Sequence, residues 1–102
     1  AYHLWLEDEG KVVAYLRVMK PGAKFEEASI GRVLCTRRRQ GYASLLLDEG
    51  IRVATEIYNA DSIRLEAQTY VTSLYEAAGF VQVTDEFLED GIPHVGMLWT
   101  KK

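Results

Sequence analysis

Hydrophobic and polar residues alternate along the first twenty positions in a way that predicts a β-hairpin. His3 to Leu6 and Val12 to Met19 are rich in β-branched and aromatic residues, and the Glu-Asp-Glu-Gly stretch at 7–10 between them has the composition of a turn. The second segment places hydrophobic residues on both faces. We therefore expect it to form a central strand that is covered on both sides.

A strand, a basic turn, a helix and a second strand are predicted next. Ser29 to Cys35 reads as a strand, and 62–67 alternates apolar with polar residues in the manner of another. The segment between them has helical periodicity, so the two strands are expected to be parallel neighbours joined by a crossover. The predicted apolar face of the helix consists of Ala43, Leu46, Leu47, Gly50, Ala54 and Ile57.

The remaining third of the chain adds a short helix and two strands. Val71 to Ala78 reads as a helix that ends at Gly79, a C′ glycine, and Phe80 to Val83 begins a strand. An acidic, turn-rich segment over 85–93 precedes the last strand, His94 to Thr100. The order ββ-β-α-β-α-β-β predicts an α/β fold with a mixed sheet, and residues 1–102 fit one domain.

Composition and charge narrow the function classes. The 102 residues include 12 Lys and Arg against 15 Asp and Glu, a net charge of −3, which argues against a nucleic-acid partner. A single cysteine permits no intramolecular disulfide, and no apolar run approaches the roughly 20 residues of a membrane span. We expect a cytoplasmic protein with no membrane partner. The spacing of acidic residues and histidines indicates no metal site.

The segment with the clearest chemical signal lies between a predicted strand and the start of a helix. A helix start offers unpaired amide groups and a positive dipole end, and glycine lets the backbone approach an anion closely. The arginines at 37–39 would add positive charge around a polyphosphate. A solvated basic turn without a ligand is the alternative. The predicted anion-binding residues are Arg38, Arg39, Gln40, Gly41, Tyr42, Ala43 and Ser44.

Four stretches resemble the ElaA-like branch of the GNAT superfamily of acyl-CoA-dependent N-acetyltransferases. The pattern Arg-x-x-Gly-x-Ala at 38–43 is similar to the pyrophosphate loop of that superfamily. More specific are Glu-Glu-Ala-Ser-Ile-Gly-Arg-Val at 26–33, Leu-Glu-Ala-Gln at 65–68 with Tyr-Glu-Ala-Ala-Gly-Phe at 75–80, and Glu-Asp-Gly-Ile-Pro-His-Val-x-Met at 89–97. The resemblance implies a splayed central sheet flanked by helices. We expect the N-terminal strand and helices of the family to be absent from this chain.

The resemblance also implies acetyl-CoA as co-substrate. Its pantetheine arm would pair with Val33, Leu34 and Cys35 on the splayed strand. From its residue type alone, Cys35 reads as a small hydrophobe rather than a reactive thiol. Tyr75 occupies the position of the family's general acid, which protonates the departing thiolate. Its alternative is a packed tyrosine with a hydrogen-bonded hydroxyl.

The general base and the acceptor contacts are less specific. Glu27 is the leading candidate for the base, because family bases often come from this strand. His94 competes with it, since an imidazole can act near neutral pH. Glu89 and Asp90 could instead orient a cationic acceptor. Solvated acids and a histidine that only makes a loop hydrogen bond are the ordinary alternatives.

The sequence therefore predicts an N-acetyltransferase that moves an acetyl group to a primary amine by direct attack in a ternary complex. A CoA-binding or interaction module with little catalysis is the alternative. A nucleic-acid-binding domain is a third hypothesis, against which the net charge weighs; it would be built on Arg32, the arginines at 37–39 and Arg52. The resemblance also allows a homodimer, because pairing through the last strands is common in the superfamily.

Overall fold

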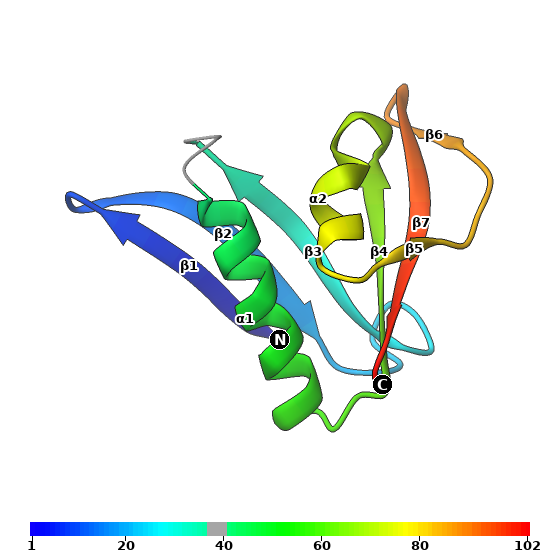
Figure 1. Ribbon diagram of the computed structural model, residues 1–102, viewed down its shortest axis with the longest axis horizontal. Helices are drawn as coiled ribbons and strands as arrows, with labels where there is room; N and C mark the ends of the chain where they lie inside the picture. The colour runs from blue at the N-terminus through cyan, green and yellow to red at the C-terminus, as the bar shows by residue number, and fades with distance from the viewer. Residues whose placement is uncertain (37–40) are drawn as a thin grey trace.

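The computed structural model describes residues 1–36 and 41–102, which form one mixed sheet and two α-helices (Figure 1). The helices are α1 (Tyr42–Glu56) and α2 (Thr72–Ala77), the latter preceded by a single 3-10 turn, η1 (Thr69–Val71). The strands are β1 (Tyr2–Asp8), β2 (Lys11–Met19), β3 (Ala28–Cys35), β4 (Ser62–Gln68), β5 (Val81–Gln82), β6 (Phe87–Glu89) and β7 (Ile92–Thr100).

The strands lie in the order β1-β2-β3-β4-β7-β5, with β6 paired to β7. β3 and β4 are parallel and joined through α1, which confirms the predicted crossover, and the other pairs are antiparallel. β3 and β4 pair only at Ala28 with Ile63 and at Ser29 with Arg64. Beyond these residues the two strands diverge toward the start of α1 and toward α2 (Figure 1). The splayed sheet implied by the family resemblance is present.

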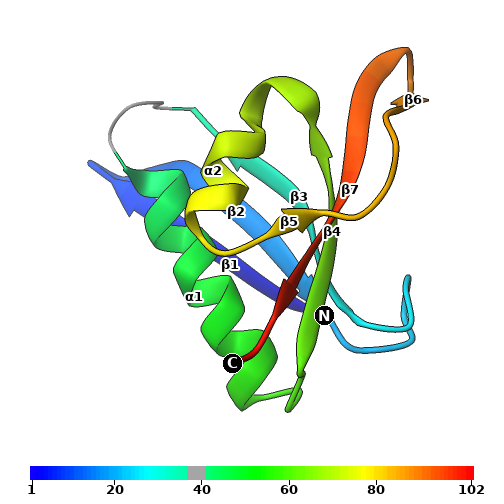
Figure 2. The same cartoon turned by 45° about the vertical axis from the view of Figure 1, so that its right-hand side comes forward.

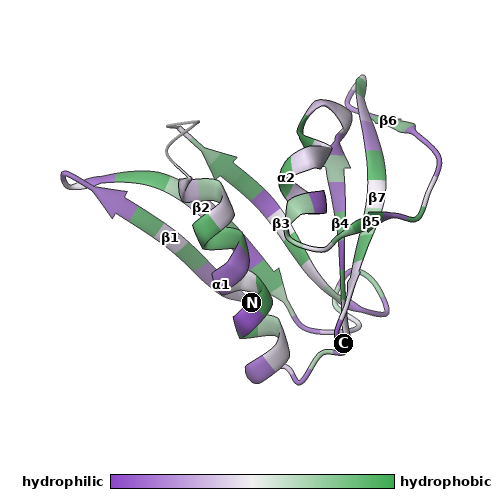
Figure 3. Ribbon diagram, in the orientation of Figure 1, coloured by the Kyte–Doolittle hydropathy of each residue, from purple (hydrophilic) through white to green (hydrophobic). Residues whose placement is uncertain are grey.

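The hydrophobic core lies between the sheet and its helices, and both helices cover the same face (Figure 2). Gly50 allows α1 to approach the sheet closely, because a Cβ there would lie 3.3 Å from side-chain atoms of Leu16 and Ile30. Hydrophobic and hydrophilic bands alternate along β1 and β3 (Figure 3), as expected for strands with one buried face. The buried residues of α1 are Leu46, Leu47, Gly50, Val53 and Ala54.

Three details correct the sequence-based expectations. β2 is central, but within the described residues a helix covers only one of its faces, and Arg17 on the other face is half-buried. Ile57 follows the last turn of α1 and is 48% exposed, while Val53, which the predicted face lacked, is buried. The acidic segment over 85–93 contains a short strand, β6, because it folds back on the start of β7.

A β-bulge in β3 reorients the end of that strand. Tyr15 pairs with Leu34 and Arg17 pairs with Gly31, so Arg32 and Val33 together lie opposite Leu16. Arg32 adopts the left-handed conformation, with φ of 55°. An extra residue inverts the alternation beyond it, so Val33 packs against the core while Leu34 is 64% exposed on the other side. The bulge thus selects which β3 side chains reach each face of the splay.

Candidate functional site

A pocket of about 350 Å³ lies where β3 and β4 diverge, on the face that carries the helices. The end of β3, the first turn of α1, η1 and α2 all contribute to it. It brings together most of the predicted site residues that the structure describes: Val33, Cys35, Gly41, Tyr42, Ala43, Ser44 and Tyr75. Cys35 is half-buried, so it is more accessible than a core residue. Leu34 points to the opposite side because of the bulge and does not line this pocket.

The start of α1 has the features of an anion site. Gly41 precedes it with φ of 76°, and none of the side chains that the structure describes caps it. The first turn itself contains no acidic residue. The Tyr42 hydroxyl donates a hydrogen bond of 2.9 Å to Asp8, which ties the helix start to β1. Arg38, Arg39 and Gln40 lie outside the described residues.

Tyr75 is held in place by the end of α2. The Phe80 amide donates to the Tyr75 carbonyl at 3.0 Å and the Gly79 amide donates to the Glu76 carbonyl at 3.0 Å, which together form a Schellman motif. The Phe80 ring packs edge-on against the Tyr75 ring with centroids 6.1 Å apart. Gly79, at φ of 103°, confirms the predicted helix end. Burial raises the pKa of the Tyr75 phenol to about 12, so the hydroxyl keeps its proton at neutral pH.

A second cleft of about 700 Å³ adjoins the first pocket, and its lining includes Arg17 and Leu34, whose side chains lie on the face of the sheet away from α1. The two share six lining residues, so they adjoin each other at the splay. His94 and Asp90 line this cleft from β7 and from the turn before it, as does Leu34 from β3. The shared residues are Val33, Cys35, Gln68, Tyr70, Val71 and Tyr75.

The His94 ring has a defined orientation. It is 8% exposed and stacks on Phe87, with ring centroids 6.1 Å apart. Its Nδ1 lies 2.7 Å from the Ile92 carbonyl oxygen, which can only accept, so Nδ1 carries the hydrogen. In the neutral ring this leaves Nε2 with a lone pair, 3.6 Å from a Glu89 carboxylate oxygen. His94 therefore has the geometry of a base whose tautomer is fixed by the backbone.

Glu27 does not line either cavity, although Lys24 and Phe25, which line the second cleft, lie three and two residues before it. It immediately precedes β3, at the end where β3 and β4 are paired. At about 3.3 Å per residue, six residues of strand separate it from Val33 by roughly 20 Å. Sequence reasoning missed Tyr70, Val71 and Leu74, whose signal was an aromatic and apolar run directly after a strand.

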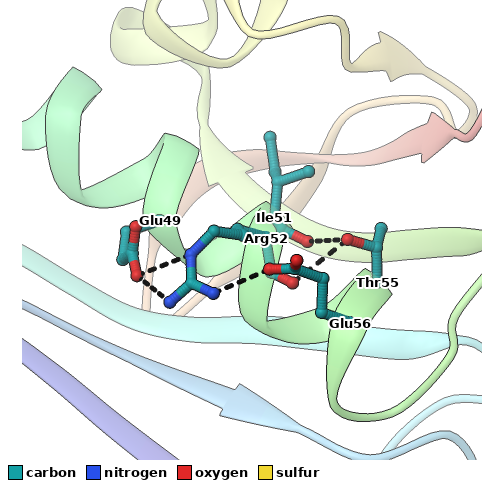
Figure 4. A network of polar contacts seen from close by, with 5 residues as sticks. All are labelled: Glu49, Ile51, Arg52, Thr55 and Glu56. Carbon is teal, nitrogen blue, oxygen red and sulfur yellow. Dashed lines mark hydrogen bonds and ion pairs between the residues drawn. The ribbon is translucent and has the colours of Figure 1, made fainter.

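Arg52 bears on the nucleic-acid hypothesis. On the exposed side of α1 it donates to Glu49 and, at 2.7 Å, to Glu56 (Figure 4). Hydrogen bonds to these carboxylates raise the pKa of Arg52, and the same contact lowers the pKa of Glu49. Thr55 in the same turn donates to the Ile51 carbonyl. The charge of Arg52 is thus matched locally, which leaves it poorly suited to a phosphate backbone.

Comparison with known proteins identifies the family of this chain. The family model described as "Acetyltransferase (GNAT) domain" matches residues 1–101. The chain belongs to the GNAT acetyltransferase family, and its splayed mixed sheet is the acyl-CoA N-acyltransferase fold. None of its described helices is long and apolar enough to cross a membrane.

Within this family the chain is a homologue of ElaA. It is 34% identical over 95 residues to ElaA of Escherichia coli, covering 91% of this chain and 61% of that protein. It is 43% identical over 101 residues to UPF0039 protein Rv2851c of Mycobacterium tuberculosis, covering 94% and 62%. The chain thus spans about three-fifths of the length of these relatives.

Solved structures give the same result. An acyl-CoA N-acyltransferase from Pseudomonas aeruginosa superposes with a TM-score of 0.85 at 33% identity, covering 96% of this chain and 67% of that one. The crystal structure of Escherichia coli ElaA superposes with a TM-score of 0.85 at 29% identity, covering 95% and 66%.

Proposed function

We propose that this chain transfers an acetyl group from acetyl-CoA to a primary amine by direct attack in a ternary complex. One observation carries the proposal: a single pocket joins the start of α1, the diverging ends of β3 and β4, and Tyr75. A second cleft reaches the same tyrosine from the other face of the sheet. Two substrates can therefore approach one point from opposite sides.

The residues of the first pocket fit the parts of acetyl-CoA. The first-turn amides of α1, next to Gly41, would hold the pyrophosphate. Val33, Val71 and Leu74 offer an apolar wall for the pantetheine arm, and the unpaired end of β3 offers backbone groups to its amides. The co-substrate supplies an activated thioester. A similar fold, at 18% identity and a TM-score of 0.74, is that of a Bacillus anthracis protein crystallised in complex with acetyl coenzyme A.

The proton transfers are assigned to two residues of the second cleft. As the acceptor nitrogen bonds to the acetyl carbon and the carbon–sulfur bond breaks, one proton must leave the amine and one must reach the sulfur. We assign the first to Nε2 of His94, whose lone pair is available in the neutral ring. Tyr75 donates its phenolic hydrogen toward the departing sulfur.

The pyrophosphate assignment is tested by adding a side chain at Gly41. Asparagine tolerates the left-handed conformation, so Gly41→Asn should fold normally while its side chain intrudes on the anion site. Gly10 is the matched control, because it has the same φ of 76° and, like Gly41, no described atom beyond its chain neighbours within 4 Å of an added Cβ. We expect CoA affinity to fall at least about tenfold in Gly41→Asn and to be unchanged in Gly10→Asn. Equal CoA affinity in both variants would refute the assignment.

Turnover separates this proposal from the alternative. The expected result is that the 102-residue chain acetylates an amine. The reaction is monitored by the release of the free thiol of CoA. CoA binding without turnover of any amine would instead identify a CoA-binding module.

A further inference from the structure

The second cleft has an uneven distribution of charge that the proposed transfer chemistry does not use. Two of its charged groups pair with each other: the Lys24 ammonium lies 3.3 Å from a Glu66 carboxylate oxygen. On the wall formed by β2 and β3, Arg17 and Arg32 have no carboxylate partner among the described residues. The cleft therefore presents two unmatched guanidinium groups on one side.

Arg17 is the more constrained of the two. It is half-buried, and its Nε is shielded from solvent without any hydrogen-bond partner among the described residues. A shielded donor on a charged group is costly to leave unsatisfied. Arg17 lies opposite Gly31 in the sheet, next to the bulge, and the left-handed conformation of Arg32 places a second guanidinium on the same cleft. The bulge thus brings two cations beside the point where the strands diverge.

The opposite wall of the cleft is acidic. Asp90 lies in the turn between β6 and β7 with φ of 52°, and Glu89 lies beside His94. An acceptor that spans the cleft meets carboxylates and the proposed base at one end and guanidinium groups at the other. An ammonium group fits the first end and an anion fits the second.

We propose that the acceptor is a primary amine that also carries a carboxylate, which Arg17 binds with the support of Arg32. This assignment rests on the proposed acetyl transfer and narrows its substrate class. The amine lies toward His94, and the carboxylate satisfies the donors of Arg17. A plain alkylamine would leave those donors unsatisfied and should be a poorer substrate.

The test uses ω-aminocarboxylates, from glycine to aminohexanoate, each compared with its own carboxamide. The two members of a pair have the same length and the same amine and differ in the negative charge. We expect the carboxylate to have the higher kcat/KM, by about tenfold or more, at the chain length that spans the cleft. The chain length at which the carboxylate is most strongly preferred over the carboxamide measures the distance that the acceptor spans.

Arg17→Met removes the charge and retains an unbranched stem of similar packing. In this variant kcat/KM for the carboxylates should fall to the level of the carboxamides, while kcat/KM for the carboxamides should not change. The unchanged carboxamide rate shows that the variant is folded. Arg52→Met, on the exposed side of α1, alters net charge equally and should keep the full preference.

A binding measurement without acetyl-CoA keeps this inference separate from the transfer chemistry. Calorimetric titration of the best carboxylate and its carboxamide into the wild-type chain should show tighter binding of the carboxylate, and Arg17→Met should abolish the difference. Equal binding and equal acetylation of the two ligands would overturn the carboxylate assignment and leave the proposed transferase function intact. A carboxylate preference in binding with no turnover of any amine would overturn the transferase function alone.

Discussion

Replacing Tyr75 with phenylalanine tests the chemistry of the site at a single atom. The ring stays, so the packing on Phe80 and both backbone hydrogen bonds of the Schellman motif are retained. Among the described residues the Tyr75 hydroxyl makes no hydrogen bond, so we expect the free energy of unfolding to change by less than about 0.5 kcal/mol at neutral pH. Any large effect on turnover then comes from the lost hydrogen-bond donor.

The size of the kinetic effect follows from the pKa. General acid catalysis typically contributes about 10²–10⁴-fold, and it is most effective when the acid matches the leaving group. Burial raises the pKa of the Tyr75 phenol to about 12, whereas a thiol has an ordinary pKa of about 8.5. Complete transfer to the sulfur is uphill, so Tyr75 stabilises the departing thiolate mainly as a hydrogen-bond donor, and solvent supplies the proton that finally reaches the sulfur. We expect kcat to fall by about 10²-fold, with acetyl-CoA affinity unchanged.

The pH profile adds an independent readout. Because Tyr75 stays protonated up to about pH 12, it should contribute no alkaline limb to kcat below pH 10, and wild type and Tyr75→Phe should share one profile shape there. Tyr70→Phe is the matched control, since Tyr70 lines both pockets but is 63% exposed. Steady-state kinetics and thermal unfolding of both variants distinguish a catalytic role of the Tyr75 hydroxyl from a structural one. Near-normal kcat in Tyr75→Phe, or a stability loss of about 1 kcal/mol with unchanged kcat, would identify a structural tyrosine.

Two further predictions concern stability. The raised pKa of Tyr75 means that the folded chain keeps a proton that the unfolded chain loses above pH 10, so this contribution is complete below pH 10 and is lost as pH rises to 12. Between these values wild type should lose about 1.4 kcal/mol per pH unit more than Tyr75→Phe, measured by denaturant titration, and parallel curves would contradict it. Gly79→Ala should lower the free energy of unfolding by at least about 1–2 kcal/mol in the same assay, because Gly79 has a φ of 103° and an added Cβ would lie 3.1 Å from Trp99. An unchanged midpoint of denaturation would refute this.

Local sequence signals predicted the elements that position the site. Gly79 marked the end of α2 because a left-handed residue after a helix favours glycine, and Phe80 completed the motif that holds Tyr75. The crossover rule predicted that β3 and β4 are parallel neighbours. In each case the cause lies within a few residues of the chain or in the connection between two adjacent elements.

The orientation of the β3 side chains was not predictable in the same way. A strict two-residue alternation places Val33 with Ser29 and Gly31, but the bulge opposite Leu16 moves Val33 to the helix side. No glycine marks the bulged residue, since Arg32 itself takes the left-handed conformation. The bulge depends on pairing with β2, and such pairing is set by packing rather than by local propensity.

The position of the candidate base illustrates the same limit. Glu27 was predicted from its place beside β3, yet β3 pairs with β4 only at Ala28 and Ser29, so Glu27 lies at the closed end of the splay. His94 reaches the open end from the opposite wall because β7 pairs with β4 in the register that sets His94 against Gln68. Which end of a parallel pair opens depends on how the helices pack on each strand, here α1 on β3 and α2 on β4, and this is determined by the assembled fold. The position of a residue relative to such a splay is therefore set by sheet register rather than by its distance from the strand in the sequence.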